Sequence, residues 1–292
     1  MKKLILTSLI ALSLPFLKAQ SDSTGLAGDQ VNLHGILELF QKSSSPEEFE
    51  KNINDESNKV NNLDLNNDGE VDYIKVIGSQ KEDAHIFILQ VPVSESENQD
   101  IAVLELEKTG KQEAQIQIIG DEEIFGADYI LEPKSEADNE EADDEGGPNV
   151  LLERNTAIVV NVWGWPCVRF VYAPGYVVYS SPWRWRVYPT WWRPWRNIGW
   201  AVWHPIRFRY SAFPIRHHSV VRCVNAHKVY RPIRSHSTTV TKRYAPAHKN
   251  HTVTRKKTTV TGPKGHTRTK TTTTVKGKKG NVKAKRTTVR RK

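Results

Sequence analysis

The sequence has little sulfur, almost no acidic residues in its second half and no long apolar stretch. Among 292 residues there are two Cys and one Met. Two Cys do not form the paired-Cys pattern of a structural zinc site. After the leader described below, no apolar run approaches the ~20 residues that span a bilayer as a helix. The sequence therefore predicts neither a Cys-ligated zinc site nor a membrane span in the mature chain.

Recognisable catalytic motifs are also missing. The chain contains no nucleophile elbow, no HExxH zinc motif and no phosphate-binding loop, which are the usual short signatures of hydrolases, metalloproteases and nucleotide-binding enzymes. Acidic side chains are plentiful, but no two of them stand out as a catalytic pair. We therefore predict a protein that is not an enzyme. An enzyme of unrecognised type ranks third, after the two functions given below.

Charge is divided unequally between the two halves of the chain. Residues 21–150 contain 32 Asp or Glu and 8 Lys or Arg, whereas residues 151–292 contain 31 Lys or Arg and a single acid, Glu153. Such asymmetry favours contact between the basic half and a polyanion or membrane surface, or association between the two halves. It predicts the kind of partner and says nothing about the fold.

Residues 1–19 have the pattern of a secretory signal peptide. Lysines precede a mostly apolar run at 4–17, and Ala19 offers a small residue for cleavage. The run of fourteen residues is too short to span a bilayer. We expect export to the periplasm, the cell surface or the medium. Because exported compartments can oxidise thiols, Cys167 and Cys223 form either a disulfide or two unpaired thiols, and the sequence leaves both open.

Residues 27–133 predict a small acidic α+β domain. Apolar residues recur with helical spacing over 30–42, and Asp29 is the expected N-cap of that helix. A second helix is predicted over 46–53, because Ser45 begins a capping box and Pro follows it in the first turn.

Strand-like runs follow the two helices. They lie at 71–78, 85–93, 101–107 and 113–119. The short links between them suit antiparallel neighbours, and residues 129–131 are expected to add a short edge strand. We therefore predict two helices covering one face of an antiparallel meander of about four strands. An acidic linker at 134–148 follows, with nothing to bury.

A candidate calcium loop lies between the second helix and the first strand. Its sequence over 64–72 is DLNNDGEVD. Calcium takes 6–8 oxygen ligands, and alternate positions of a loop that turns around the ion supply them. Gly69 permits the sharp turn, and Val71 is expected to point into the core. The predicted ligands are Asp64, Asn66, Asp68 and Asp72 through their side chains and Glu70 through its carbonyl oxygen.

This loop resembles the first nine positions of an EF-hand. An EF-hand has a bidentate Glu at its twelfth position, where this chain has Lys75. The DxDxDGxxD calcium loops that join strands in propeller-type repeats are a better match, with Asp72 in the closing position. The resemblance implies that these five residues bind calcium, and it implies no particular fold. We expect a structural role, because the site is single and incomplete by EF-hand standards. The alternative is a solvated Asn/Asp/Gly turn without a metal.

All nine Trp lie between residues 163 and 203, in a region rich in Arg and Pro. Frequent Pro favours extended segments over 149–234, and runs at 157–163 and 167–172 predict a pair of strands. Arg pairs with phosphate and stacks on aromatic rings, while Trp settles at membrane interfaces. The predicted polyanion or membrane-surface residues are Trp183, Arg184, Trp185, Arg186, Trp191, Trp192, Arg193, Trp195 and Arg196. The alternative is that these aromatic side chains pack on the acidic domain and that the Arg pair with its carboxylates.

Residues 235–292 contain 18 Lys or Arg, 16 Thr and no Asp or Glu. Such a segment buries too little apolar area to offset the conformational entropy lost on folding. We therefore predict a disordered basic tail.

As a whole, the order of signal peptide, calcium loop, strand meander, Trp/Arg-rich block and Thr/Lys-rich tail resembles exported proteins of Bacteroidetes-type bacteria. The resemblance implies export and no activity. We predict an envelope protein that binds anionic surface polymer or lipid headgroups and holds a structural calcium ion. The alternative is a self-associating protein whose acidic and basic halves pair within or between chains. Nucleic acid is a less favoured partner, because an exported protein seldom meets it.

Overall fold

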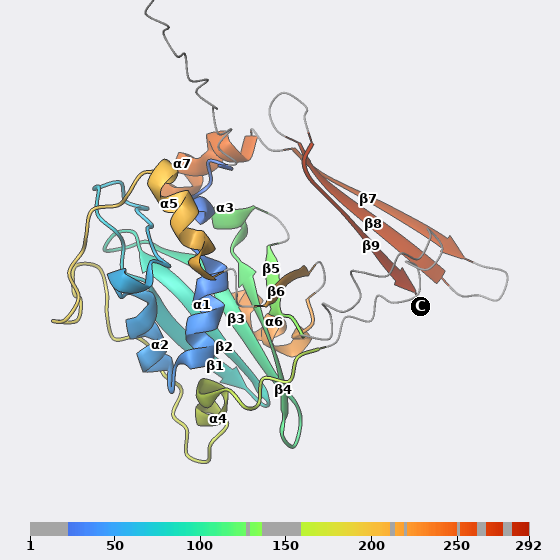
Figure 1. Ribbon diagram of the computed structural model, residues 1–292, viewed down its shortest axis with the longest axis horizontal. Coiled ribbons are helices and arrows are strands. Elements are labelled where there is room, and N and C mark those ends of the chain that lie inside the picture. Colours follow the sequence, from blue (N-terminus) through green and yellow to red (C-terminus); the bar gives the residue numbers. More distant parts are fainter. Residues whose placement is uncertain are drawn as a thin grey trace, which may run out of the picture.

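The computed structural model describes residues 23–126, 129–135, 159–210, 214–218, 221–249, 252–261, 267–276 and 282–291. The predicted signal peptide at 1–19 and most of the predicted acidic linker at 134–148 lie outside these ranges. The remainder has the α+β architecture expected from the sequence (Figure 1). Among the described helices, none has both the length and the apolar character needed to cross a membrane.

Both N-terminal helices form where the sequence places them. A short 3-10 turn, η1 (Ala27–Gln30), precedes α1 (Leu33–Lys42), and α2 (Pro46–Ile53) follows before a second 3-10 turn, η2 (Glu56–Asn58). The Ser45 hydroxyl accepts a hydrogen bond from the Glu48 N–H at 3.2 Å, as the capping box predicts.

The N-cap of α1 differs from the prediction. Asn32 caps the helix by accepting from the Gly35 N–H at 3.2 Å. The Asp29 carboxylate instead accepts from the backbone N–H groups of Thr24 and Gly25, at 2.7 and 3.0 Å. Asp29 belongs to η1, so it lies one turn too early to cap α1.

An antiparallel sheet of six strands forms the centre of the molecule, in the order β1-β2-β3-β4-β5-β6. Its strands are β1 (Lys75–Lys81), β2 (Ala84–Pro92), β3 (Asn98–Gly110), β4 (Glu113–Gly120), β5 (Ile130–Pro133) and β6 (Ile215–His218). A short helix, α3 (Glu122–Phe125), joins β4 to β5. The predicted edge strand is β5, but it is not at the edge, because β6 pairs with its free side through Leu131 and His217.

Each face of this sheet carries its own apolar cluster. On one face, α1 and α2 pack through residues such as Phe40 and Phe49 onto Phe87 of β2. On the other face, α6 (Val224–Tyr230) packs onto Ile86 and Val103. Figure 1 shows α1 and α2 in front of the sheet and α6 behind it.

The two cysteines, for which the sequence left a disulfide or two unpaired thiols open, lie in different clusters. Cys167 is buried in the first cluster and Cys223 in the second, and both are free thiols. A disulfide requires Cα atoms within about 7 Å, whereas the sheet separates these two clusters. Burial raises the pKa of both thiols, so both stay protonated at neutral pH.

The prediction of paired strands at 157–163 and 167–172 is wrong for the described residues, which begin at 159. Residues 159–162 have no regular secondary structure, and residues 166–171 form a helix, α4 (Pro166–Val171). Pro166 occupies the first helical turn, where a missing N–H costs nothing. Cys167, Val168 and Val171 are the buried residues of α4. Their spacing places them on one face of a helix, whereas the alternating pattern of a strand would not.

Further helices follow in the basic half. They are α5 (Trp200–Ile206), η5 (Arg207–Tyr210), η6 (Arg231–Ile233) and α7 (Thr238–Lys249). The described part of the predicted disordered tail is therefore structured. In α7, Val240 is fully buried, and the Glu97 carboxylate binds the start of the helix. Packing on the acidic half supplies the stabilisation that the isolated tail lacks.

The end of the chain forms a second, three-stranded antiparallel sheet of β7 (Thr252–Thr261), β8 (Thr267–Lys276) and β9 (Val282–Arg291). The Thr/Val repeats of the tail become these strands, with Val253 paired to Val275 and Val275 to Ala284. This sheet stands apart from the six-stranded sheet in Figure 1. Disorder was predicted because the segment alone buries too little apolar area. Pairing of the repeats with one another was not included in that prediction.

Candidate functional site

The candidate calcium loop, residues 64–72, lies between η2 and β1. Leu65 and Val71 are buried and fix the loop to the core, as predicted for Val71. Asn67 and Gly69 have positive φ values of 64° and 87°, which produce the sharp turn. The Asp72 N–H donates to the Leu63 carbonyl at 2.8 Å and so closes the base of the loop.

The structure brings the four predicted side-chain ligands together around this turn. Asp64 accepts from the N–H groups of Asp68 at 3.2 Å and Gly69 at 3.0 Å. The Asn66 side-chain oxygen accepts from the Asp68 N–H at 2.8 Å, and the Asp68 carboxylate accepts from the Glu70 N–H at 2.9 Å. The loop is thus closed by its own backbone donors, which is also what a solvated Asx turn would do.

One amide group lies between two of the carboxylates. The Asn66 Nδ2 donates to Asp68 Oδ2 at 2.8 Å and to Asp72 Oδ1 at 3.3 Å. Asp72 is 7% exposed, and its second oxygen accepts from the Leu65 N–H at 2.5 Å. Burial, together with the charges of Asp64 and Asp68, raises the pKa of Asp72 to about 8. A cation between these carboxylates would offset that repulsion.

The loop is not arranged as a closed metal cage. In the described residues, no group of three or more His, Cys, Asp or Glu side chains has the spacing of a metal site. Of the five predicted ligands, Asn66 is an amide and Glu70 is assigned through its carbonyl, so only three are carboxylates. Calcium accepts amide and carbonyl oxygens. The five residues therefore have the right chemistry, and calcium binding stays a prediction.

Residues distant in sequence surround the loop. Arg243 of α7 donates to the Leu65 carbonyl and, at 3.3 Å, to the Asn66 carbonyl. The Asn197 amide lies 3.4 Å from the Asp64 carboxylate, and the Val71 N–H donates to the Trp195 carbonyl at 2.8 Å. Arg243 and Asn197 could not be predicted from the sequence, because they are more than a hundred residues from the loop and belong to no local motif.

The Trp/Arg segment, residues 182–196, lies against the acidic half through its tryptophans. Trp192 is 4% exposed, and its ring packs on Tyr73 at 5.1 Å and on Tyr188 at 4.7 Å between centroids. Trp183, Trp185 and Trp195 are half-buried, whereas Trp191 is exposed. The prediction that the aromatic side chains pack on the acidic domain therefore holds for Trp192.

The arginines of the same segment are directed differently. Arg184, Arg186, Arg193 and Arg196 are all exposed. In the part of the chain that the structure describes, none of the four forms an ion pair with a carboxylate. Arg193 donates to the carbonyls of Thr190 and Trp192, at 3.1 and 2.8 Å, and the Arg186 guanidinium lies 5.5 Å from the Trp185 ring. The four arginine side chains are thus exposed to solvent.

A second set of basic residues does pair with the acidic half. Arg216 and Arg222 lie 3.2 and 2.9 Å from the Glu132 carboxylate. His227 Nδ1 lies 2.8 Å from Glu105, whose side chain is fully buried. These contacts link the neighbouring strands β5 and β6, attach Arg222 to β5 and hold α6 on β3. Pairing between the two halves therefore occurs within one chain at these positions.

Comparison with protein-family models found no match to this chain, and comparisons with curated proteins and with solved structures likewise found none. The candidate sites therefore depend on the geometry described above.

Proposed function

We propose that this chain is a non-enzymatic exported envelope protein that binds anionic surface polymer or lipid headgroups through the Trp/Arg segment. The observation that carries the proposal is the contrast between two sets of arginines. Arg216 and Arg222 have an acidic partner, whereas the four arginines of residues 182–196 are exposed and lack one within the described chain.

The chemistry of the segment fits phosphate-rich ligands. A guanidinium group binds phosphate through two parallel N–H donors and keeps its charge at all physiological pH values. The buried Trp192 holds the segment on the core, and the partly exposed tryptophans beside the arginines suit the boundary between water and lipid. The strands β7, β8 and β9 add eleven Lys or Arg and no acid, which extends the attraction for a polyanion.

The role proposed for the calcium loop is structural. A calcium ion held by residues 64–72 would stiffen the loop that Asn197 and the Trp195 carbonyl contact. It would thereby hold the end of the Trp/Arg segment in place. Single extracellular calcium modules bind at ~10⁻⁴–10⁻³ M, and we expect that range here.

The test uses vesicles of phosphatidylglycerol and of phosphatidylcholine with the full chain. A variant with Arg184, Arg186, Arg193 and Arg196 all changed to Gln should lose most binding to the anionic vesicles. The control variant removes the same number of exposed charges elsewhere, at Lys81, Lys111, Arg169 and Lys228. Equal loss in both variants, or binding that salt does not weaken, would contradict the proposal.

Self-association is the second candidate, supported by the ion pairs between the halves. The buried contacts of Glu105 and Glu132 with basic partners favour pairing within one chain. Co-expressed halves, divided in the acidic linker, should then bind each other. If self-association were the main function, the full chain would not bind added polyanion, because its basic half would already be paired.

A further inference from the structure

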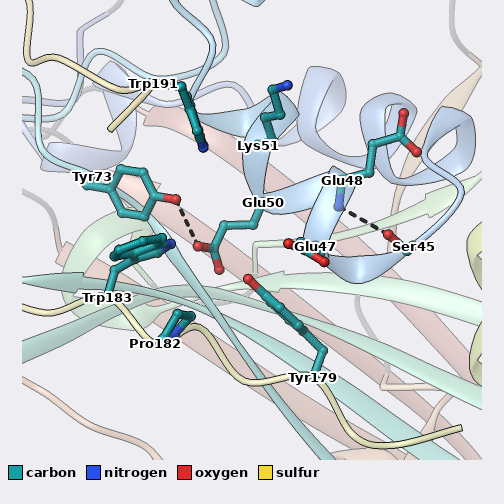
Figure 2. Close-up of a pocket in the computed structure, with 10 residues that line it drawn as sticks. All are labelled: Ser45, Glu47, Glu48, Glu50, Lys51, Tyr73, Tyr179, Pro182, Trp183 and Trp191. Carbon is teal, nitrogen blue, oxygen red and sulfur yellow. Dashed lines mark hydrogen bonds between the residues drawn. The ribbon is translucent and has the colours of Figure 1, made fainter. Parts of the chain in front are cut away.

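A cavity of about 390 Å³ lies between α2 and residues 179–191 (Figure 2). This volume falls within the ~300–1,000 Å³ of small-molecule sites. Two of its walls, Trp183 and Trp191, belong to the Trp/Arg segment, but the proposed function does not use the cavity itself. Its lining residues are Ser45, Glu47, Glu48, Glu50, Lys51, Tyr73, Tyr179, Pro182, Trp183 and Trp191.

Glu50 of α2 forms the floor of this cavity and is 1% exposed. One carboxylate oxygen accepts from the Tyr73 hydroxyl at 2.8 Å and from the Ser181 hydroxyl at 2.9 Å. The other accepts from the Val76 N–H at 2.7 Å. Because three donors point at it, Glu50 is held in one position beneath the cavity. The site is therefore preformed.

Aromatic rings form the walls. Figure 2 shows Tyr73 and Trp183 on one side of Glu50, Tyr179 on another and Trp191 above it. The Lys51 ammonium already lies 5.8 Å from the centre of the Trp191 ring, which is a cation–π distance. Tyr73 points its hydroxyl group at Glu50 and is 1% exposed. The accessible ring surfaces of the cavity are therefore those of Trp183, Tyr179 and Trp191.

The charge balance of the cavity is negative. Glu47 is exposed and has no hydrogen-bond or ion-pair partner within the described chain, and Figure 2 shows its carboxylate on the side of Tyr179. Glu48 is turned away, since its carboxylate accepts from the Ser44 N–H at 2.7 Å. Glu47 and Glu50 thus face Lys51 as the only basic residue in the lining. An anionic ligand would be repelled here.

We propose that this cavity binds an organic ammonium ion, a primary or quaternary amine. Aromatic faces attract such a cation through the ring quadrupole. The carboxylates of Glu47 and Glu50 add charge attraction at the open side and at the floor. The inference goes beyond anion binding by the arginines, because the ligand is a cation that carries no phosphate, although Trp183 and Trp191 border both surfaces.

The test titrates the full chain with choline and, as its neutral counterpart of the same shape, with 3,3-dimethyl-1-butanol, following tryptophan fluorescence and heat. Choline should bind about tenfold more tightly than the alcohol. Ethanolamine reports whether a primary amine is also accepted, and glucose reports whether the rings instead stack on a sugar. Equal binding of choline and the alcohol, absence of choline binding, or tighter binding of glucose would overturn the proposal.

Variants locate the site without disturbing the fold. Glu47→Gln removes an exposed charge that holds no partner, and Trp191→Leu removes an exposed ring; each should weaken choline binding about threefold to tenfold. Glu95→Gln, which removes an exposed carboxylate outside the lining, is the matched control and should change the affinity by less than about twofold. If Glu95→Gln weakened choline binding as much as Glu47→Gln does, the binding would reflect general charge and the site would be excluded.

Discussion

The guanidinium group of Arg234 donates two hydrogen bonds to the buried carboxylate of Asp121, from Nε to Oδ2 at 2.5 Å and from Nη2 to Oδ1 at 3.0 Å. The two residues are 113 positions apart and belong to the halves of opposite charge. The side chain of Asp121 is 1% exposed. Its negative charge therefore depends on Arg234 for compensation, and this pair connects the segment before α7 to the end of β4.

Removing Arg234 should destabilise the whole fold. Arg234→Ala leaves a buried carboxylate without its charge partner, which costs about 3 kcal/mol in unfolding free energy. Arg231→Ala removes an exposed arginine three residues earlier and should cost less than about 0.5 kcal/mol. Urea unfolding measures both. Equal and small changes would show that the halves do not depend on this pair.

The start of α7 should loosen when Glu97 is neutralised. Its carboxylate accepts from the Ser237 hydroxyl at 2.5 Å and the Thr239 N–H at 3.2 Å, and it also binds the Thr238 hydroxyl. These hydrogen bonds lower the pKa of Glu97 to about 2. Glu97→Gln should therefore speed amide hydrogen exchange in α7, whereas Glu95→Gln, an exposed neighbour, should not.

The pH dependence of this contact follows from the direction of the shift. A carboxylate whose pKa is lower in the folded state stabilises that state above its unfolded pKa, near 4.5. The contribution is lost as the pH falls from about 4.5 to about 2. Protection of α7 amides should fall over this window in the wild-type chain. In Glu97→Gln it should be low throughout, and a wild-type-like pH profile there would contradict the assignment.

The cysteines should behave as two buried free thiols. Cys167 is fully buried and Cys223 is 1% exposed, and burial raises the pKa of both thiols. A thiol reagent should therefore label neither residue in the folded chain and both after unfolding without reductant. If unfolded, unreduced protein offered no reactive thiol, the two residues would form a disulfide in solution and the arrangement of the two clusters would be wrong.

Calcium should bind the loop at one ion per chain. Asp68→Ala removes a carboxylate at the exposed side of the turn and should abolish saturable heat in a titration with Ca²⁺. Asp55→Ala, at the N-cap of the neighbouring η2 turn, removes a carboxylate that accepts hydrogen bonds from Ser57 and should leave the affinity unchanged. A folded wild-type chain that gave no heat up to ~10 mM Ca²⁺ would reduce the loop to a solvated turn.

Elements that are specified by a few neighbouring residues were predicted correctly from the sequence. The capping box at Ser45 placed α2 correctly, and the Asn/Asp/Gly spacing of residues 64–72 brought Asp64, Asn66, Asp68 and Asp72 to one turn. Elements that depend on distant partners were missed. The run Ile215–His218 has little apolar character of its own, and it is a strand because β5 offers a free edge.

In the Trp/Arg segment, too, some features followed from the sequence and others depend on the fold. The spacing of aromatic and basic residues identified the Trp/Arg segment, but it could not distinguish the exposed Arg184 from the paired Arg222. That difference arises from where Glu132 lies in the folded chain. The cavity over Glu50 was likewise invisible, because Tyr73, Tyr179 and Trp191 come from segments that only the fold brings together.

The salt dependence of binding to a soluble polyphosphate tests the proposed function most directly. If Arg184, Arg186, Arg193 and Arg196 contact phosphate, the logarithm of the binding constant should fall steeply with the logarithm of salt concentration between ~50 and ~500 mM, and the variant with all four changed to Gln should have a slope shallower by about three. The control variant with the same number of charges removed elsewhere should keep most of the wild-type slope. An unchanged slope in the Arg variant would show that these arginines do not bind the anion.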